Sequence, residues 1–256
     1  MRTDRFQEDR RNQIVVLLQQ RERMSVDDLA RHFKVTGATI RSDLTALMQR
    51  NKVIRTLGSA MIVRQAPVSP LAERLRLQAS EKRAIGRLAA SQIRDNEVIA
   101  LDASSTSLAM APFLKALSGL TLVTNCLAVA MEVIGHKNIR VIMPGGHLQH
   151  ESASLVGPET LGFLKTLHVQ TAFIGARSIS LDQGLCDSDP ATMEFKKTLI
   201  RISRQTVALV DSSKWDTVSL TRFAGFDEIQ VLVSDAGIAQ KNVRALTQKG
   251  VKVLVA

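Results

Sequence analysis

The sequence predicts an α/β protein of two domains, in which a small helical domain with a β-hairpin precedes a larger, mostly parallel and doubly wound sheet. Two observations support this prediction. Apolar residues first recur with a helical period, and after Asn51 they alternate with a period of two. From Asn96 onward, short β-branched runs alternate with stretches of helical period, which is typical of buried parallel strands joined by helices.

The N-terminal helices are predicted from their apolar faces and their capping residues. A first helix is expected over roughly residues 8–22, where Ile14 and Leu18 share a face. Ser25 and Thr36 are the predicted N-caps of a second and a third helix, because a hydroxyl there accepts a hydrogen bond from a free backbone N–H. The inner side of the third helix is predicted to hold Ile40, Leu44, Leu47 and Met48.

A hairpin is predicted after these helices. Residues 53–57, in which Val53, Arg55 and Leu57 alternate with Ile54 and Thr56, read as one strand, "LGS" reads as a turn, and "AMIV" reads as the second strand. Three helices and a hairpin make a winged helix-turn-helix, which we assign to residues 1–64. Residues 65–80 contain two of the six prolines and are predicted to be a linker that enters a helix through "EKRAIGRLAASQI".

The remaining residues, 81–256, are predicted to form the α/β domain. Helices are expected at about 105–117, 126–136, 189–204 and 237–249. The predicted strands are "EVIALD", "LTLVTN", "IRVIMPGG", "QTAFIGA", "QTVALVDSS", "IQVLVSD" and "VKVLVA". Ligands of such sheets bind beyond the carboxyl ends of the strands, so we look there for a binding site.

Composition narrows the class of protein. Of 256 residues, 45% are hydrophobic and 23% are charged, as in globular proteins. No apolar run approaches the ~20 residues that span a bilayer, and the charged start "MRTDRFQEDRR" is unlike a secretory signal. Cys126 and Cys186 are expected to be reduced thiols. We therefore expect a cytoplasmic protein with no membrane partner.

The positive charge is concentrated at the N-terminus. The formal net charge is +10. Residues 1–65 hold 13 Lys and Arg against 7 Asp and Glu, a net of +6. This distribution is typical of an N-terminal domain that binds nucleic acid phosphates. The chain has no Tyr and one Trp, which argues against recognition of single strands by base stacking.

Polar residues and glycines follow the predicted strands. Hydroxyls and backbone N–H groups after Asp102 suit an anion, and Asp102 itself suits sugar hydroxyls. Together with the polar groups after the other strands, they predict a small, hydroxylated, anionic ligand such as a phosphorylated sugar. Taken singly, each feature has an ordinary structural explanation as a helix cap, a turn glycine or a solvated lysine. His147 and His150 lack a further metal ligand nearby in sequence, so we expect neither a metal nor a cofactor.

The residues resemble the DeoR family of bacterial transcriptional regulators over nearly the whole chain. Seven blocks, "LDASST", "TN", "PGG", "SLVG", "FIGA", "EFKK" and "DSSK", follow the order of the family's sensor domain. The family's N-terminal signature is matched by Arg10, Ile14, Leu18, Thr36, Thr39, Ile40, Arg41, Asp43 and Leu44.

The resemblance implies a regulator, more often a repressor than an activator, of a carbohydrate catabolism operon. It implies a sensor domain similar in fold to ribose-5-phosphate isomerase that binds a phosphorylated sugar effector, and a homodimer or homotetramer. Carried over to this chain, the effector site comprises Asp102, Ser104, Ser105, Thr106, Thr124, Asn125, Gly145, Gly146, Gly175, Glu194, Lys196 and Lys214.

Double-stranded operator DNA is the expected partner of the N-terminal domain. The third helix is expected in the major groove, where Arg41 has the fork to bind a guanine; a solvated surface arginine is the alternative. The expected DNA-binding residues are Thr36, Thr39, Arg41, Ser42, Lys52 and Arg55. Family members commonly have Arg or Lys in place of Ser42, and His-Gly-Gly-Ala in place of "LGSA" at 57–60, so two hydrogen-bonding positions are altered.

Two other functions were weighed. A phosphosugar isomerase needs a carboxylate base beside the sugar. Isomerases carry acidic residues just after the strand that here ends in "FIGARSIS", whereas this chain has Arg177 and Ser178 there. The first acidic residue after this strand is Asp182. A protein-interaction adaptor would not require the basic N-terminal domain. We therefore expect a regulator rather than an enzyme.

Overall fold

The computed structural model describes residues 2–21, 23–49, 53–56, 59–62, 70–217 and 219–256. The main bodies of two compact units are residues 1–65 and residues 66–215 with 221–256. Each unit is described separately below. Among the described residues, no helix combines the length and the apolar character needed to cross a bilayer.

The N-terminal unit is the predicted helix-turn-helix with a hairpin. Its helices are α1 (Arg2–Arg21), α2 (Val26–Phe33) and α3 (Gly37–Gln49). Its strands β1 (Arg23–Ser25), β2 (Val53–Thr56) and β3 (Ser59–Ile62) form an antiparallel sheet in the order β1-β3-β2. The first helix begins earlier than predicted, and β1 was not predicted because three residues are too few to show a period.

The helix boundaries follow from local hydrogen bonds. Ser25 Oγ accepts the N–H of Asp28 at 3.0 Å, and Thr36 Oγ1 accepts the N–H of Thr39 at 3.2 Å, as the predicted caps require. Lys34 ends α2 in the left-handed region with φ 53°. The prediction for Met48 was wrong: it is 39% exposed. It follows Leu44 by four residues but lies at the edge of the apolar face, two turns after the exposed Arg41.

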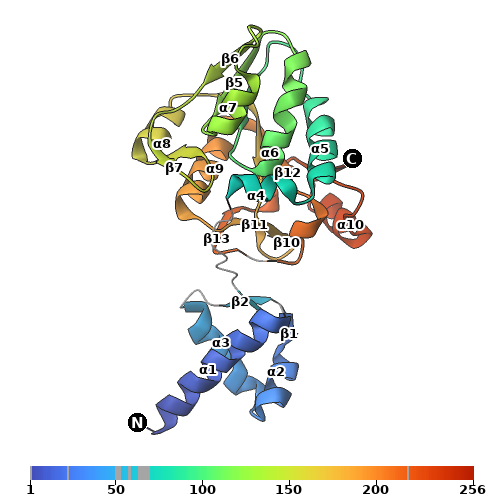
Figure 1. Ribbon diagram of the computed structural model, residues 1–256. Helices are drawn as coiled ribbons and strands as arrows, with labels where there is room; N and C mark the ends of the chain where they lie inside the picture. The colour runs from blue at the N-terminus through green and yellow to red at the C-terminus, as the bar shows by residue number, and fades with distance from the viewer. Residues whose placement is uncertain (1, 22, 50–52, 57–58, 63–69, 218) are drawn as a thin grey trace. The chain divides into compact units, whose positions relative to one another are not determined.

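The C-terminal unit is built on a seven-stranded sheet in which every neighbouring pair is parallel. The order is β15-β14-β12-β9-β4-β5-β6; Figure 1 labels β5, β6 and β12 of this sheet. The strands are β4 (Val98–Leu101), β5 (Leu120–Thr124), β6 (Ile139–Ile142), β9 (Val169–Gly175), β12 (Ser203–Leu209), β14 (Val231–Ser234) and β15 (Lys252–Val255). Each of the seven predicted strands is one of these, so the predicted α/β fold is confirmed.

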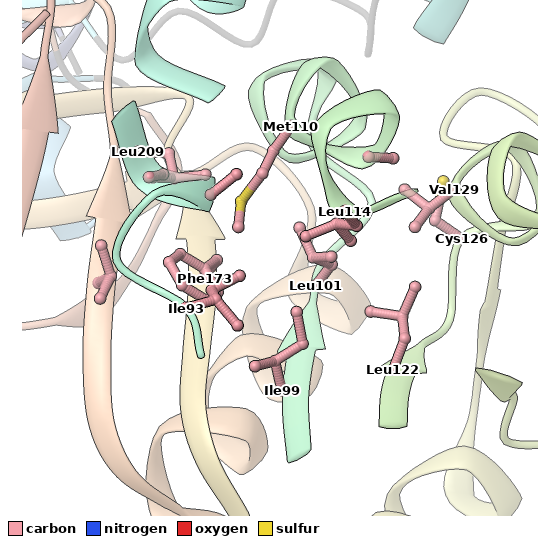
Figure 2. Packing of buried hydrophobic residues seen from close by; sticks show 14 of the residues in the cluster. Ile93, Ile99, Leu101, Met110, Leu114, Leu122, Cys126, Val129, Phe173 and Leu209 are labelled. Atoms are coloured by element: carbon pink, nitrogen blue, oxygen red, sulfur yellow. The ribbon is translucent and has the colours of Figure 1, made fainter. Parts of the chain in front are cut away.

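Helices cover both faces of this sheet. One face carries α4 (Leu71–Arg76), α5 (Ala79–Ala90), α6 (Ser105–Met110), the 3₁₀ helix η1 (Ala111–Ala116) and α7 (Leu127–Val133). The other carries α8 (Pro158–Leu164), α9 (Pro190–Ile202) and α10 (Gln240–Gln248). Along β4, Ile99 and Leu101 pack with Met110 on the first face (Figure 2), whereas Ala100 packs with Phe195 on the second. This alternation makes the sheet doubly wound.

Several short elements were not predicted. The hairpin of β7 (His147–Gln149) and β8 (Ser154–Val156) follows β6. A second sheet joins β10 (Ser178–Ser180), β11 (Gly184–Asp187) and β13 (Thr221–Ala224). Two further 3₁₀ helices are η2 (Ser212–Lys214) and η3 (Phe226–Glu228). Unlike the strands of the main sheet, short strands such as "SIS" and "GLCD" are not continuous apolar runs.

The predicted linker at 65–80 is shorter than expected. Leu71 is 7% exposed and belongs to the core of the C-terminal unit, and α5 already begins at Ala79. Residues 65–69 lie outside the described part of the chain. From Pro70 onward, the segment is therefore part of the C-terminal unit.

Candidate functional site

The outer face of α3 is available to DNA. Ile40, Leu44 and Leu47 are buried in the core of the N-terminal unit, whereas Arg41 and Ser42 are exposed. The two outward residues lie one and two positions after Ile40, on the opposite side of the helix. Arg41 therefore lies on the exposed face of α3, and its contact with a base stays a prediction.

The start of α3 is organised by two threonines. Thr36 Oγ1 lies 2.9 Å from Thr39 Oγ1 and also accepts the Thr39 N–H. Thr36 is thus committed to capping α3. Thr39 remains at the solvent-accessible N-terminal turn, the part of a recognition helix that contacts base edges.

A buried carboxylate fixes α3 to α1. Asp43 has no exposed surface, and its Oδ2 and Oδ1 accept the Nε–H groups of Arg10 at 2.6 Å and Arg11 at 3.0 Å. Arg11 also lies 3.6 Å from Glu8. A buried charge is tolerated when it is paired and hydrogen-bonded in this way. Asp43 therefore positions the recognition helix, a role that its place in the sequence signature did not reveal.

The wing is described only in part. Arg55 lies in β2, and its backbone pairs with Ala60 of β3. Lys52, Leu57 and Gly58 lie outside the described residues. The proposed DNA contacts of Lys52 and Arg55 stay predictions.

In the C-terminal unit, a network of charges lies at the carboxyl ends of β4 and β9. Lys196 of α9 is 3% exposed. Its Nζ donates to Gly175 O at 2.8 Å and to Asp187 Oδ2 at 2.5 Å, and lies 3.2 Å from Asp102 Oδ2. It also lies 4.9 Å from the centre of the Phe223 ring. Burial acts to lower the pKa of Lys196, but the charges of Asp187 and Asp102 outweigh it, so the pKa is raised and the ammonium stays charged.

Asp102 is the centre of this network. It is fully buried; its Oδ2 accepts the Gly175 N–H at 3.2 Å, and its Oδ1 accepts the Ser104 N–H at 3.2 Å and the Ser107 hydroxyl at 2.5 Å. The carboxylate is therefore occupied by protein donors. This geometry favours a positioning role for Asp102 over the direct sugar contact predicted from sequence.

The hydroxyls after Asp102 divide into two pairs. Ser104 Oγ caps α6 by accepting the Ser107 N–H at 3.1 Å, and it donates to Ser107 Oγ at 2.9 Å. Ser105 and Thr106 are 7% and 5% exposed. In the described part of the chain, their hydroxyls form no hydrogen bond with side chains, so they remain the better candidates for a ligand.

The predicted glycines have close neighbours within the protein. A Cβ on Gly175 would lie 2.3 Å from Ser104 Oγ, so glycine lets the end of β9 approach the Ser104 loop. Gly146 has φ +137°, and a Cβ there would lie 2.2 Å from Thr160 Oγ1. Gly145 O accepts the Thr160 hydroxyl at 2.5 Å. Packing against α8 is therefore sufficient to explain "PGG".

Thr124 and Asn125 lie at the end of β5. Thr124 Oγ1 accepts the Cys126 N–H at 3.1 Å, and Asn125 Nδ2 donates to Leu155 O at 2.9 Å. Asn125 Oδ1 is buried and accepts no hydrogen bond from the described residues. A buried acceptor of this kind suits a hydroxyl donor.

Glu194 and Lys214 are not drawn into the Lys196 network. Glu194 precedes Lys196 by two positions, which turns it toward the other side of α9, where it lies 4.0 Å from Lys197 and is 46% exposed. Lys214 Nζ lies 4.0 Å from Asp211 Oδ2.

A second buried lysine lies near Lys214. Lys82 is 2% exposed, and its Nζ donates to Arg74 O at 2.6 Å and Leu77 O at 2.5 Å. Burial lowers the pKa of Lys82 to about 8; Asp211 opposes this change, whereas Lys214 and Arg74 reinforce it. Lys82 thus joins α5 to α4 and faces the charged groups of the "DSSK" segment.

Arg74 is the site residue that sequence reasoning missed most clearly. It was assigned to a linker, yet it lies on α4, half-buried among charged groups of the site. Burial lowers the pKa of Arg74, Asp187 and Asp102 act to raise it, and Arg177 acts to lower it. Asp187 was also missed, because it reaches Lys196 through the unpredicted β11.

Both cysteines are buried in the C-terminal unit. Cys126 and Cys186 form no disulfide within the described part of the chain, and burial raises the pKa of Cys126. Within the described ranges, no cluster of His, Cys, Asp and Glu has the arrangement of a metal site.

Comparison with known proteins gives matches over both units. The model of the DeoR-like helix-turn-helix domain matches residues 10–66, and that of the DeoR C terminal sensor domain matches residues 77–236. The chain is 34% identical over 246 residues to an uncharacterized HTH-type transcriptional regulator, YulB, of Bacillus subtilis, covering 96% of this chain and 95% of that protein.

Two further relatives have more specific names. The HTH-type transcriptional repressor GlcR of Bacillus subtilis is 33% identical over 252 residues, covering 98% of this chain and 96% of its own. The glycerol-3-phosphate regulon repressor of Escherichia coli is 28% identical over 247 residues, covering 96% and 98%. These relatives, similar over their full length, are regulators and not enzymes.

Similarity to solved structures is more distant. A D-ribose-5-phosphate isomerase in complex with phospho-erythronic acid has a TM-score of 0.41 and 18% identity, covering 54% of each chain. The eIF2B beta of Chaetomium thermophilum has a TM-score of 0.43 and 11% identity, covering 77% of this chain and 54% of its own. We draw no conclusion about function from these two structural similarities.

Proposed function

The chain belongs to the DeoR family of transcriptional regulators, and from this premise we propose that it represses a carbohydrate catabolism operon in response to a phosphorylated sugar or polyol. Family membership implies DNA binding by the helix-turn-helix and effector binding by the sensor domain. The printed names of two relatives, a repressor and a glycerol-3-phosphate regulon repressor, support the finer proposal.

The observation that carries the effector proposal is the Lys196 network. A buried ammonium is held by Asp102, which follows β4, and by Asp187 of β11, and it also donates to Gly175 at the end of β9. This is the edge at which parallel α/β sheets bind ligands. The candidate hydroxyls of Ser105 and Thr106 and the open acceptor Asn125 Oδ1 belong to the loops that follow β4 and β5. Their chemistry suits a hydroxylated anion.

For the DNA side, we propose that Arg41 and Thr39 on α3 contact bases, while the Asp43 network holds α3 in place. A homodimer or homotetramer formed through the sensor domain would bring two recognition helices to one operator. Effector binding changes operator affinity to the extent that the effector prefers one arrangement of these helices.

The test is a titration of DNA from the chain's own promoter region, followed by fluorescence anisotropy at two salt concentrations. We expect binding that exceeds binding to competitor DNA and weakens steeply with salt. Arg41→Ala should lose roughly 1–3 kcal/mol of operator preference, whereas Arg21→Ala, exposed at the end of α1, serves as the matched control. Unchanged preference in Arg41→Ala would remove Arg41 from base recognition.

A further inference from the structure

The exposed side chains of α3 form one strip along the helix, which we call the α3 strip. In the described part of α3, they are those of Ala38, Arg41, Ser42, Thr45 and Met48. Their spacing of three or four residues keeps them on one side of the helix. A helix in the major groove presents one such side to the edges of the bases. The chemistry of the α3 strip therefore determines which base pairs the helix can bind.

Arg41 lies within the α3 strip, and its guanidinium is free. Its Nη1 and Nη2 atoms each lie 3.7 Å from the position of a Cβ on Gly37, so the side chain reaches back over the first turn of α3, as helical side chains do. Among the described residues, none forms a hydrogen bond or an ion pair with this guanidinium. Its fork is therefore available to the O6 and N7 acceptors of a guanine.

Thr45 offers a methyl group rather than a hydrogen-bond donor. Its Oγ1 donates to Arg41 O, four residues earlier, at 2.8 Å. The hydroxyl proton is therefore used within the helix, although the residue as a whole is exposed. What Thr45 presents to a base pair is the Cγ2 methyl and a hydroxyl oxygen that can only accept. It cannot donate to the acceptors of a guanine, whereas its methyl suits the methyl of a thymine.

Ala38 presents only a methyl group, on the other side of Arg41. It precedes Arg41 by three residues, and Thr45 follows Arg41 by four. At a rise of about 1.5 Å per residue, these two residues lie about 4.5 Å and about 6 Å from Arg41 along the helix axis. Base pairs are about 3.4 Å apart along a duplex. Each methyl group therefore lies within about two base pairs of the base that Arg41 is expected to bind.

We propose that the operator contains a guanine bound by Arg41 with a thymine, on either strand, within about two base pairs on each side, and that Ala38 and Thr45 contact the C5 methyl groups of these thymines. The proposal rests on the proposed function, in which α3 contacts bases. The C5 methyl of thymine is the apolar group of the major groove, and Ala and Thr side chains suit it. Ser42 both donates and accepts, so no base is assigned to it.

The experiment begins with selection of duplexes by the full chain, from a randomised library and from its own promoter DNA. We expect the selected sequences to share a guanine with thymines on both sides. In the tightest duplex, each of these thymines is then replaced singly by deoxyuridine, which removes the methyl group and leaves base pairing unchanged. Fluorescence anisotropy should show operator Kd raised about 3- to 5-fold at one thymine on each side of the guanine.

Two variants assign each methyl contact to its residue. Ala38→Gly removes the Cβ of Ala38, and Thr45→Ser removes Cγ2 but keeps the hydroxyl that donates to Arg41 O. In each variant, deoxyuridine at the partner thymine should cause no further loss, whereas deoxyuridine at the other thymine should still raise Kd about 3- to 5-fold. Ala46→Gly, the same substitution outside the α3 strip, is the matched control and should show both losses. Each variant is compared with itself on two duplexes that differ by one methyl group, so an effect of the substitution on folding cancels.

The outcomes separate this proposal from the proposed function. If the chain binds its promoter specifically, yet deoxyuridine changes no Kd or changes it equally in all variants, the methyl contacts are overturned and the proposed function stands. Selected sequences that hold the guanine without flanking thymines overturn them as well. If Arg41→Ala keeps the wild-type preference, the guanine assignment is overturned. If the chain selects no sequence and binds its promoter like competitor DNA, both proposals fail.

Discussion

The two units each contain a buried carboxylate that holds basic side chains, but the networks join different elements. In the N-terminal unit, Asp43 of α3 pairs with Arg10 and Arg11 of α1, so two helices are joined. In the C-terminal unit, Lys196 of α9 pairs with Asp102, which follows β4, and with Asp187 of β11. The second network therefore lies at the carboxyl ends of strands, the edge at which parallel α/β sheets bind ligands. The comparison separates a network that positions a helix from one that lies at a candidate binding site.

Removing the cation of the second network should give the largest loss of stability. Lys196→Met leaves Asp102 and Asp187 buried without their shared partner, which should destabilise the C-terminal unit by about 3–5 kcal/mol. Trp215, the only tryptophan and 9% exposed, reports unfolding of this unit by fluorescence in denaturant. Lys197→Met, on the same helix but 33% exposed, is the control. Equal midpoints for the two variants would contradict the account.

Removing the carboxylate of the first network should have a somewhat smaller effect. Asp43→Asn leaves Arg10 and Arg11 without their charge partner, but these arginines are 20% and 14% exposed and keep some hydration. We expect a loss of about 3 kcal/mol in the N-terminal unit, followed by circular dichroism, and weakened operator binding. Asp9→Asn, exposed on α1, should leave both unchanged; a similar loss in that variant would show that the effect is not specific to the network.

The close approach of the end of β9 to the Ser104 loop can be tested by replacing two glycines with alanine. Gly175→Ala places a Cβ 2.3 Å from Ser104 Oγ, which should destabilise the C-terminal unit by about 1–3 kcal/mol. Gly145→Ala has no atom within 4 Å of the added Cβ and should stay within about 0.5 kcal/mol of wild type. If both variants match wild type in denaturant midpoint, the Ser104 loop does not require glycine.

The last prediction concerns the dependence of stability on pH that Lys82 confers. Its pKa is about 8 in the folded state against 10.5 ordinarily, so the folded state binds fewer protons between these values. Stability from this group therefore rises with pH from about 8 to 10.5, by at most about 1.4 kcal/mol per pH unit. Below pH 8 the lysine is charged in both states, and the burial penalty is fully present. The stability of Lys82→Met, measured by denaturant unfolding from pH 7 to 10.5, should lack this rise. If the stabilities of wild type and Lys82→Met change in parallel with pH, Lys82 is not the cause.

The strands of the main sheet were predictable from sequence because they are nearly continuous apolar runs. Seven such segments correspond to its seven strands. Elements without such a run escaped: β11 is "GLCD", and α4 has six residues, too few for a helical period to stand out. Met48 was misplaced because it lies four residues after Leu44 and yet at the edge of the apolar face of α3.

The site was predictable only where it follows the main strands. Asp102, Ser104, Gly175 and Lys196 do meet in one network, because parallel strands bring their carboxyl ends together. Asp187 and Arg74 were not predicted to belong to the site. They lie on β11 and α4, and tertiary packing brings these two elements to the end of the main sheet. Glu194 was predicted as a site residue because it belongs to the "EFKK" block together with Lys196. Two residues apart on a helix, the two side chains point to different faces, so Glu194 points away from the Lys196 network.

The most direct test of the account is thermodynamic linkage between operator and effector. The operator Kd is measured by anisotropy with and without the sugar phosphate that binds tightest, and the effector Kd is measured with and without operator DNA. The account predicts that effector weakens operator binding and that operator weakens effector binding by the same factor. An effector that binds the sensor domain but leaves the operator Kd unchanged would contradict it.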